Sequence, residues 1–135
     1  MTSGQAAYTC IKRRESPQGA THEMTTEKTQ HIIRLFIDAA VCTQKSGCDS
    51  VELHGAHGYL ISQFLSPYKN KRTDQYGGSF AARFRFLKEI VLGTQEAYGK
   101  DFPVSVRLTM DELVIGGIPA NLYAIFCDTR CAIGD

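Results

Sequence analysis

The chain has 135 residues, of which 43% are hydrophobic and 21% are charged, and its formal net charge is +1. This length suits one ordinary domain, and the nearly neutral charge gives no electrostatic reason to expect nucleic acid or an anionic membrane as a partner. No apolar run approaches the roughly 20 residues of a membrane-spanning helix, and the first residues lack the apolar centre of a signal peptide. We therefore expect a cytoplasmic globular protein.

The cysteines indicate neither a disulfide framework nor a metal site. Their number is odd and their spacing irregular: Cys10, Cys42, Cys48, Cys127 and Cys131. Cys127 and Cys131 would share one face of a helix, as half of a metal site, but no second pair of cysteines or histidines completes it. We expect no bound metal and reduced thiols, some of them in the core.

Residues 1–24 are rich in Gly, Pro, Ser and charge, and we expect them to be irregular. A helix is predicted from Thr26 to about Ser46, with Thr25 as its N-cap and Gly47 as its stop. Its expected apolar stripe contains Ile32, Phe36, Ala39, Ala40 and Thr43, widened by Ile33 and Ile37.

A strand is expected at 50–54, followed by a long polar loop without a helical or hairpin period. A second helix is predicted for 81–98, with Phe84, Leu87, Ile90 and Val91 in its stripe, and a second strand for 102–108. Strands that alternate with long amphipathic helices predict βαβ units and a parallel sheet. A further helix fits within residues 119–135.

The end of the first strand carries three ionisable rings within six residues, namely His54, His57 and Tyr59. Long loops inside a compact domain are usually functional, so this pattern favours a catalytic loop. The alternatives are histidines bonded to backbone carbonyls, a packed tyrosine, and zinc binding. Two histidines three residues apart without a third ligand make a weak metal motif.

Several short motifs follow one another at fixed spacing. They read HGAHGYL at 54–60, QFLSP at 63–67, NxRxDxYGGS at 70–79, Arg83, and RFL at 85–87. Over about residues 21–117 they resemble the old yellow enzyme family, the NADH:flavin oxidoreductases built on an FMN-binding TIM barrel. The resemblance implies an α/β fold: a partial TIM (β/α)8 barrel of about two βα units, with an N-terminal helix and a long catalytic loop.

Such barrels need about 250 residues, so the resemblance implies an internal fragment. We expect an irregular segment at 1–24, the barrel fragment at 25–118, and an unmatched tail at 119–135.

The resemblance also assigns roles to four residues. His54 and His57 would bind the carbonyl oxygen of the substrate, because hydride addition to a conjugated C=C bond drives negative charge onto that oxygen. Tyr59 would donate the proton, since a phenol remains protonated at neutral pH yet can protonate a carbanionic carbon. Arg107 would lie beside the flavin; its alternative is a surface ion pair. Arg72 and Asp74 are expected to brace the loop.

Together these residues predict an FMN-dependent oxidoreductase of the ene-reductase type. It would pass a hydride from NAD(P)H through FMN to the activated C=C bond of a small α,β-unsaturated carbonyl compound. The alternative is a catalytically inactive fragment that binds no flavin, or that self-associates or assembles only with complementary chains. An incomplete barrel exposes strand edges and apolar surface.

Overall fold

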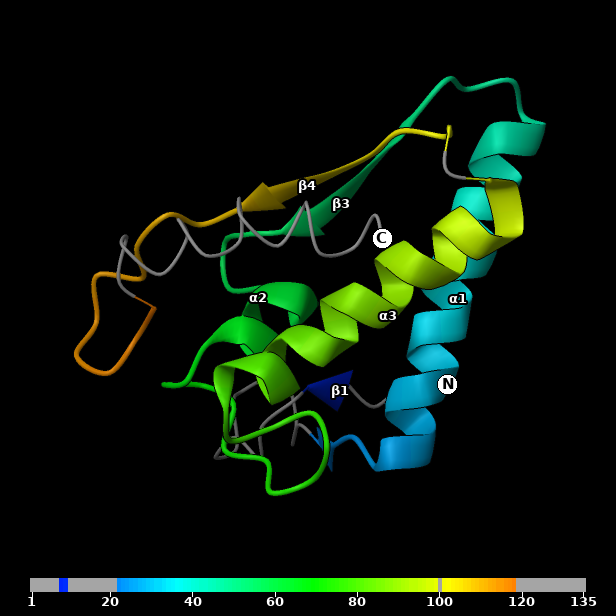
Figure 1. Cartoon of the computed structure of the whole chain (residues 1–135). Helices are drawn as coiled ribbons and strands as arrows, with labels where there is room; N and C mark the ends of the chain where they lie inside the picture. Colours follow the sequence, from blue (N-terminus) through cyan, green and yellow to red (C-terminus); the bar gives the residue numbers. More distant parts are fainter. Residues whose placement is uncertain (1–7, 10–21, 100, 119–135) are drawn as a thin grey trace, which may run out of the picture.

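The computed structural model describes residues 8–9, 22–99 and 101–118. In chain order the elements are β1 (Tyr8–Thr9), β2 (His22–Glu23), α1 (Thr26–Lys45), β3 (Val51–Gly55), α2 (Leu60–Leu65), α3 (Phe80–Tyr98) and β4 (Val104–Leu108). Strands β3 and β4 pair in parallel, and α3 connects them as a crossover helix (Figure 1). The predicted βαβ unit is confirmed.

The N-terminal segment contains a short parallel pair, β1 with β2, in which Tyr8 lies opposite His22 and Thr9 opposite Glu23. We expected no regular element here, and this expectation was wrong for these four residues. Two-residue strands are too short to leave a period in the sequence. The domain boundaries at 24/25 and 118/119 stay predictions, and the suggested helix within 119–135 lies outside the described residues.

Helix α1 begins as predicted, because the Thr25 side chain accepts a hydrogen bond of 3.2 Å from the Lys28 backbone N–H. Its most buried residues are Thr29, Ile33 and Ala40; Ile33 and Ala40 belong to the expected stripe, and Thr29 does not. The expected Ala39 is exposed, while Ile32 and Phe36 pack at the margin of the core. A broad apolar stripe shows that a helix is amphipathic, but the surface it packs against decides which line is innermost.

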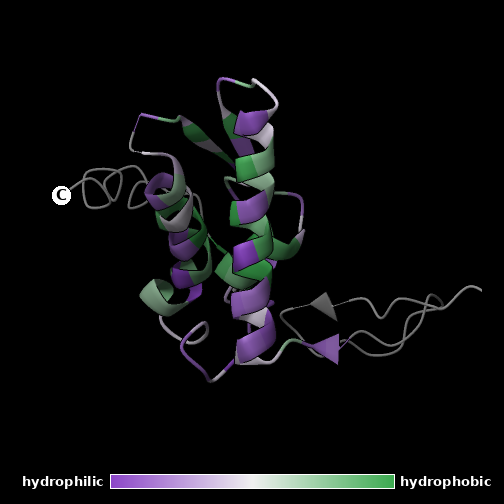
Figure 2. Ribbon diagram, turned by 90° about the vertical axis from the view of Figure 1, so that its right-hand side faces the viewer, coloured by the Kyte–Doolittle hydropathy of each residue, from purple (hydrophilic) through white to green (hydrophobic). Residues whose placement is uncertain are grey.

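Helix α3 starts at Phe80, where the Ser79 side chain accepts a bond of 3.2 Å from the Ala82 backbone N–H. Its innermost aromatic residue is Phe86, which has no exposed surface and which the predicted stripe omitted. Phe86 meets Phe36 of α1 edge to face, with ring centroids 6.2 Å apart. The two long helices therefore pack against each other, and Figure 2 shows hydrophobic and polar positions alternating along both.

The loop after β3 contains the short helix α2, which corrects the expectation of a loop without helical structure. Six residues are too few for a window that detects helical periodicity. Helix α2 buries Ile61, Phe64 and Leu65, and the Phe64 ring stacks on Phe86 with centroids 4.1 Å apart. This contact joins the start of the loop after β3 to the crossover helix.

The β3–β4 sheet has two unlike faces. Leu53 and Gly55 are buried, and the alternate residues Glu52 and His54 are exposed. On β4 the corresponding exposed residues are Ser105 and Arg107, while the other side chains of that strand pack on the core. One face therefore rests on the helices, and the other presents polar side chains.

Cys42 and Cys48 carry free thiols, but both are exposed rather than in the core; the other three cysteines lie outside the described residues. Within the described part of the chain, no helix combines the length and the apolar character needed to cross a bilayer.

Candidate active site at the end of β3

The structure brings the three predicted rings together. His54 lies near the end of β3, His57 follows in the turn, and Tyr59 is the residue before α2. The His54 ring centroid lies 5.1 Å from that of His57 and 5.2 Å from that of Tyr59. All three side chains are exposed, Tyr59 by 62%. The cluster can therefore present two imidazoles and a phenol to one small molecule.

Arg107 lies on the same face of the sheet, because it is the cross-strand partner of His54. Its Nε donates a bond of 3.0 Å to Glu52 Oε1, and both side chains are about half exposed. Arg107 therefore does form the surface ion pair considered as the alternative role, and its partner is Glu52. Such an exposed pair contributes little stability. Among the described residues no partner occupies the remaining N–H groups of the guanidinium, which can meet a ligand.

Thr109, the first residue after β4, was not singled out from the sequence. Its hydroxyl oxygen accepts a hydrogen bond of 3.0 Å from the His57 backbone N–H. A hydroxyl side chain just beyond the carboxyl end of a parallel strand was the available signal, because barrel active sites are built there.

Arg72 and Asp74 brace the loop as expected. Arg72 Nε donates to Asp74 Oδ1 over 3.0 Å, and Arg72 Nη1 donates to the Met24 carbonyl over 2.6 Å. The hydrogen bond from Arg72 holds the pKa of Asp74 at about 2, and bonds from Thr26 and the Tyr76 backbone act in the same direction against the effect of burial. The loop is thereby tied to the segment that leads into α1.

Asn70 opens the motif at 70–79, but the sequence assigned it no structural role. It is buried, and its Nδ2 donates to the carbonyls of Phe64 and Tyr76, each over 2.7 Å. Its Oδ1 accepts a bond from the Arg72 backbone N–H. One amide therefore satisfies three backbone groups, which lets a polar loop be buried. Gly77 is required nearby, since a Cβ there would lie 2.1 Å from the Arg72 carbonyl oxygen.

Two more buried polar side chains fix the loop to α3. The Tyr76 hydroxyl donates to Glu89 over 2.8 Å, and burial, followed by this bond, raises the pKa of Tyr76 to about 12. Arg83 donates from Nε to the Leu65 carbonyl over 2.9 Å and from Nη1 to the Gly78 carbonyl. Burial lowers the pKa of Arg83. These bonds hold the loop that follows the ring cluster.

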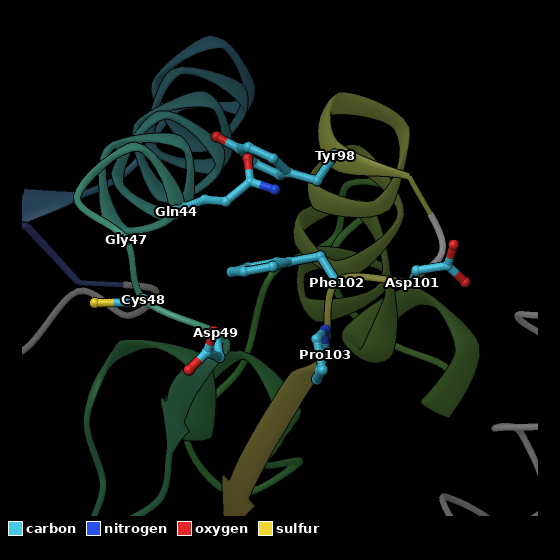
Figure 3. Close-up of a pocket in the computed structure, with 8 residues that line it drawn as sticks. All are labelled: Gln44, Gly47, Cys48, Asp49, Tyr98, Asp101, Phe102 and Pro103. Carbon is cyan, nitrogen blue, oxygen red and sulfur yellow. The ribbon is translucent and has the colours of Figure 1, made fainter.

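A cavity of about 390 Å³ lies at the opposite end of the sheet. It is lined by residues 47–49 before β3 and 101–103 before β4, together with Gln44 and Tyr98 (Figure 3). The Tyr98 hydroxyl oxygen is buried and has no hydrogen-bond partner among the described residues. Because β3 and β4 run in parallel, this cavity is separate from the ring cluster.

The fold and the position of the cluster define a class of protein. Parallel strands joined by a crossover helix, with polar side chains gathered at the carboxyl end, are the repeating arrangement of an α/β barrel.

The chain matches the family model of the NADH:flavin oxidoreductase / NADH oxidase family over residues 2–121. It belongs to this family, and its fold is part of the TIM barrel of these flavoenzymes. The matched region extends further toward the N-terminus than the motifs at about 21–117.

Among curated relatives, the NADH oxidase of Thermoanaerobacter brockii is 52% identical over 95 residues, which are 70% of this chain and 15% of that protein. The NADPH dehydrogenase of Clostridium acetobutylicum is 40% identical over 121 residues, which are 89% of this chain and 36% of that protein. The chain therefore spans well under half the length of either relative.

Two solved structures share the fold. A 2-naphthoyl-CoA reductase in complex with 2-naphthoyl-CoA matches 94% of this chain and 19% of its own, with a TM-score of 0.85 and 33% identity. Morphinone reductase matches 98% of this chain and 40% of its own, with a TM-score of 0.81 and 27% identity.

Proposed function

We propose that this chain carries the substrate-binding and proton-donating part of an FMN-dependent ene-reductase. The observation that supports this most directly is the grouping of His54, His57 and Tyr59 at the end of β3, with Arg107 on the same exposed face. The names of two structural relatives, morphinone reductase and 2-naphthoyl-CoA reductase, agree with a reduction of conjugated substrates.

The exposed face fits a flavin by the chemistry of its donors. Arg107 is a cation on an exposed polar face of the sheet, and its remaining N–H groups have no partner within the described part of the chain; we propose it as the residue that meets the FMN ring. FMN, when bound, would supply the hydride that it has received from NAD(P)H. A fixed cation beside a flavin favours its anionic form, which is a way in which a protein tunes this cofactor.

The ring cluster would act on the substrate. His54 and His57 donate hydrogen bonds to the carbonyl oxygen of an α,β-unsaturated compound and stabilise the negative charge that develops there. Tyr59 gives its hydroxyl proton to the α-carbon.

The free, exposed thiols of Cys42 and Cys48 agree with a reducing compartment, and we propose the cytoplasm.

The test uses a graft in which residues 25–118 of this chain replace the matching segment of the C. acetobutylicum NADPH dehydrogenase. In this graft, Tyr59→Phe should leave flavin reduction by NADPH unchanged and slow the reduction of 2-cyclohexenone by about 10²- to 10⁴-fold. Stopped-flow absorbance follows the two half-reactions separately. Tyr68→Phe is the matched control, because Tyr68 is 52% exposed and lies beyond α2, outside the ring cluster. Equal turnover of the two variants would remove Tyr59 from the mechanism.

Replacing His54 and His57 together by Ala should weaken the binding of 4-hydroxybenzaldehyde and cyclohexenone, while FMN stays bound. Equilibrium titration of the flavin absorbance measures both affinities. His31→Ala, on the exposed face of α1, is the control. Loss of FMN from a folded double variant would instead assign the two histidines to the cofactor site.

The second candidate is a chain that binds no flavin by itself and only assembles with complementary or identical chains. It is favoured by the segment after β4, where the Leu113 and Ile115 side chains are 88% and 100% exposed. FMN titration of the 135-residue polypeptide, followed by desalting and sedimentation analysis, separates the two candidates. Retained stoichiometric FMN on a monomer would exclude the second.

A further inference from the structure

The turn between β3 and α2 has a backbone that few residues adopt. His57 and Gly58 have φ angles of 56° and 73°, and the Tyr59 N–H bonds the Ala56 carbonyl over 3.2 Å. Two consecutive positive φ angles inside such a bond are characteristic of a type I′ turn. Gly58 takes this conformation freely, but a positive φ is uncommon for a residue with a Cβ, such as His57. Strained backbone of this kind is held by its surroundings and gathers at functional sites.

Two side chains form hydrogen bonds with the backbone of this turn. The Gln63 side-chain amide of α2 donates to the Gly58 carbonyl over 2.9 Å. Thr109 Oγ1 accepts from the His57 N–H over 3.0 Å, although the two residues are 52 positions apart. The second bond therefore connects the turn to β4, the strand that carries Arg107.

We propose that Thr109 is a positioning residue, which sets the place of the His57 ring relative to His54 and so the point at which a substrate carbonyl oxygen is bound. This inference rests on the proposed function. Two donors bind one oxygen well only if their separation is fixed, and the two imidazole centroids lie 5.1 Å apart. Through its bond to Thr109, the turn is fixed to the end of β4, the strand that carries Arg107. The proposed substrate-binding histidines and the proposed flavin-binding arginine are therefore held by the same strand.

The exposure of the bond separates positioning from a role in stability alone. His57 is exposed, so water would satisfy its N–H if the hydroxyl were absent. Removing the hydroxyl therefore leaves no buried unpaired group. What changes is the range of positions that the turn can occupy.

The first experiment measures hydrogen exchange at the His57 amide by NMR in the full 135-residue chain. Thr109→Val, which removes the acceptor, should speed exchange about 3- to 10-fold, the usual net effect of one hydrogen bond. Thr109→Ser should restore the slow rate. Ser105→Ala is the matched control, because it removes a hydroxyl of β4 that bonds Val51, away from the turn. An unchanged His57 rate in Thr109→Val would overturn the proposal.

The second experiment places the same variants in the graft and asks whether the bond matters for ligand binding. Thr109→Val should raise the Kd of 4-hydroxybenzaldehyde and the KM of cyclohexenone about 3- to 10-fold, with flavin reduction by NADPH unchanged. Thr109→Ser and Ser105→Ala should behave as the unsubstituted graft. Faster exchange without a change in Kd or KM would show a bond without a positioning role.

The outcomes separate the two proposals. A folded, flavin-loaded graft that binds neither ligand contradicts the proposed function, and the positioning role falls with it, while the exchange rates still show whether Thr109 holds the turn. If Thr109→Val does not fold in the short chain, the graft decides the matter, with retained FMN absorbance as its measure of folding.

Discussion

At the scale of single residues, Asp74 is the carboxylate on which the loop depends most. It receives bonds from Arg72, the Thr26 hydroxyl and the Tyr76 backbone. Arg72 is buried, with Glu23 3.8 Å away as a weaker second partner. Removing the Asp74 charge therefore leaves a buried guanidinium that is only partly compensated.

The pH dependence of stability follows from Asp74. Its pKa of about 2 in the folded chain is below the value of about 4 for an unfolded carboxyl group. The contribution of Asp74 is therefore complete above about pH 4 and is lost as the pH falls toward about 2. Urea unfolding at a series of pH values should show this acid limb, a fall in the free energy of unfolding between about pH 4 and about pH 2.

Asp74→Asn should lower the free energy of unfolding by about 2 kcal/mol at pH 7 and flatten the acid limb. The exposed carboxylate of Glu96 on α3 offers the control Glu96→Gln, which should change neither. An acid limb that persists in Asp74→Asn would assign it to another carboxylate.

At the scale of elements, Arg83 connects α3 to Leu65 at the end of α2 and to Gly78 in the loop before α3. Its guanidinium bonds two backbone carbonyls at once, those of Leu65 and Gly78. A lysine ammonium cannot reproduce this planar fork.

Arg83→Lys should therefore destabilise the chain by about 1–3 kcal/mol, with an earlier loss of the near-UV circular dichroism of the aromatic rings than of the helical signal. Arg85→Lys is matched to it, because Arg85 is exposed two residues further along the same helix. Similar unfolding midpoints for the two variants would show that the fork is not needed.

The elements also show which features of the fold could be predicted from sequence. The two long helices and the two paired strands have strong periods and caps, such as Thr25 and Gly47, so their order was predictable. Helix α2 was not, because six residues carry too little periodicity. Which residues of α1 are innermost depends on how the helix packs against α3, and such tertiary contacts leave no local pattern in the sequence.

The candidate site was predictable in part for a related reason. His54, His57 and Tyr59 share one short segment, so their neighbourhood is local and the motif is visible. Thr109 is 52 residues from its partner His57, and only the register of β3 on β4 brings the two together. The Glu52 bond to Arg107 depends on the same register.

At the scale of the whole molecule, Phe64 is the side chain at which the core and the loop meet. It is fully buried, stacks on Phe86, and meets Tyr76 edge to face at 6.2 Å. The Arg72 guanidinium lies over the same ring, 5.7 Å from its centre.

Phe64→Ala should lower the free energy of unfolding by about 3–5 kcal/mol. It should also remove cooperative unfolding in urea, because α2, the crossover helix α3 and the loop after α2 would lose their common contact. Phe80→Ala provides the comparison, since Phe80 is only partly buried at the start of α3 and should cost less. If both variants lose the same free energy of unfolding, Phe64 is not the central contact of the core.

The parallel pairing of β3 with β4 also has a consequence for the time at which the site acquires its shape. During synthesis His57 leaves the ribosome long before Thr109, and a parallel pair cannot close until its crossover helix has been made. Contacts across long sequence separations form slowly. The turn that carries His57 should thus fluctuate among conformers in the nascent chain and settle only after β4 has docked, so the geometry of the ring cluster reports that this segment has finished folding.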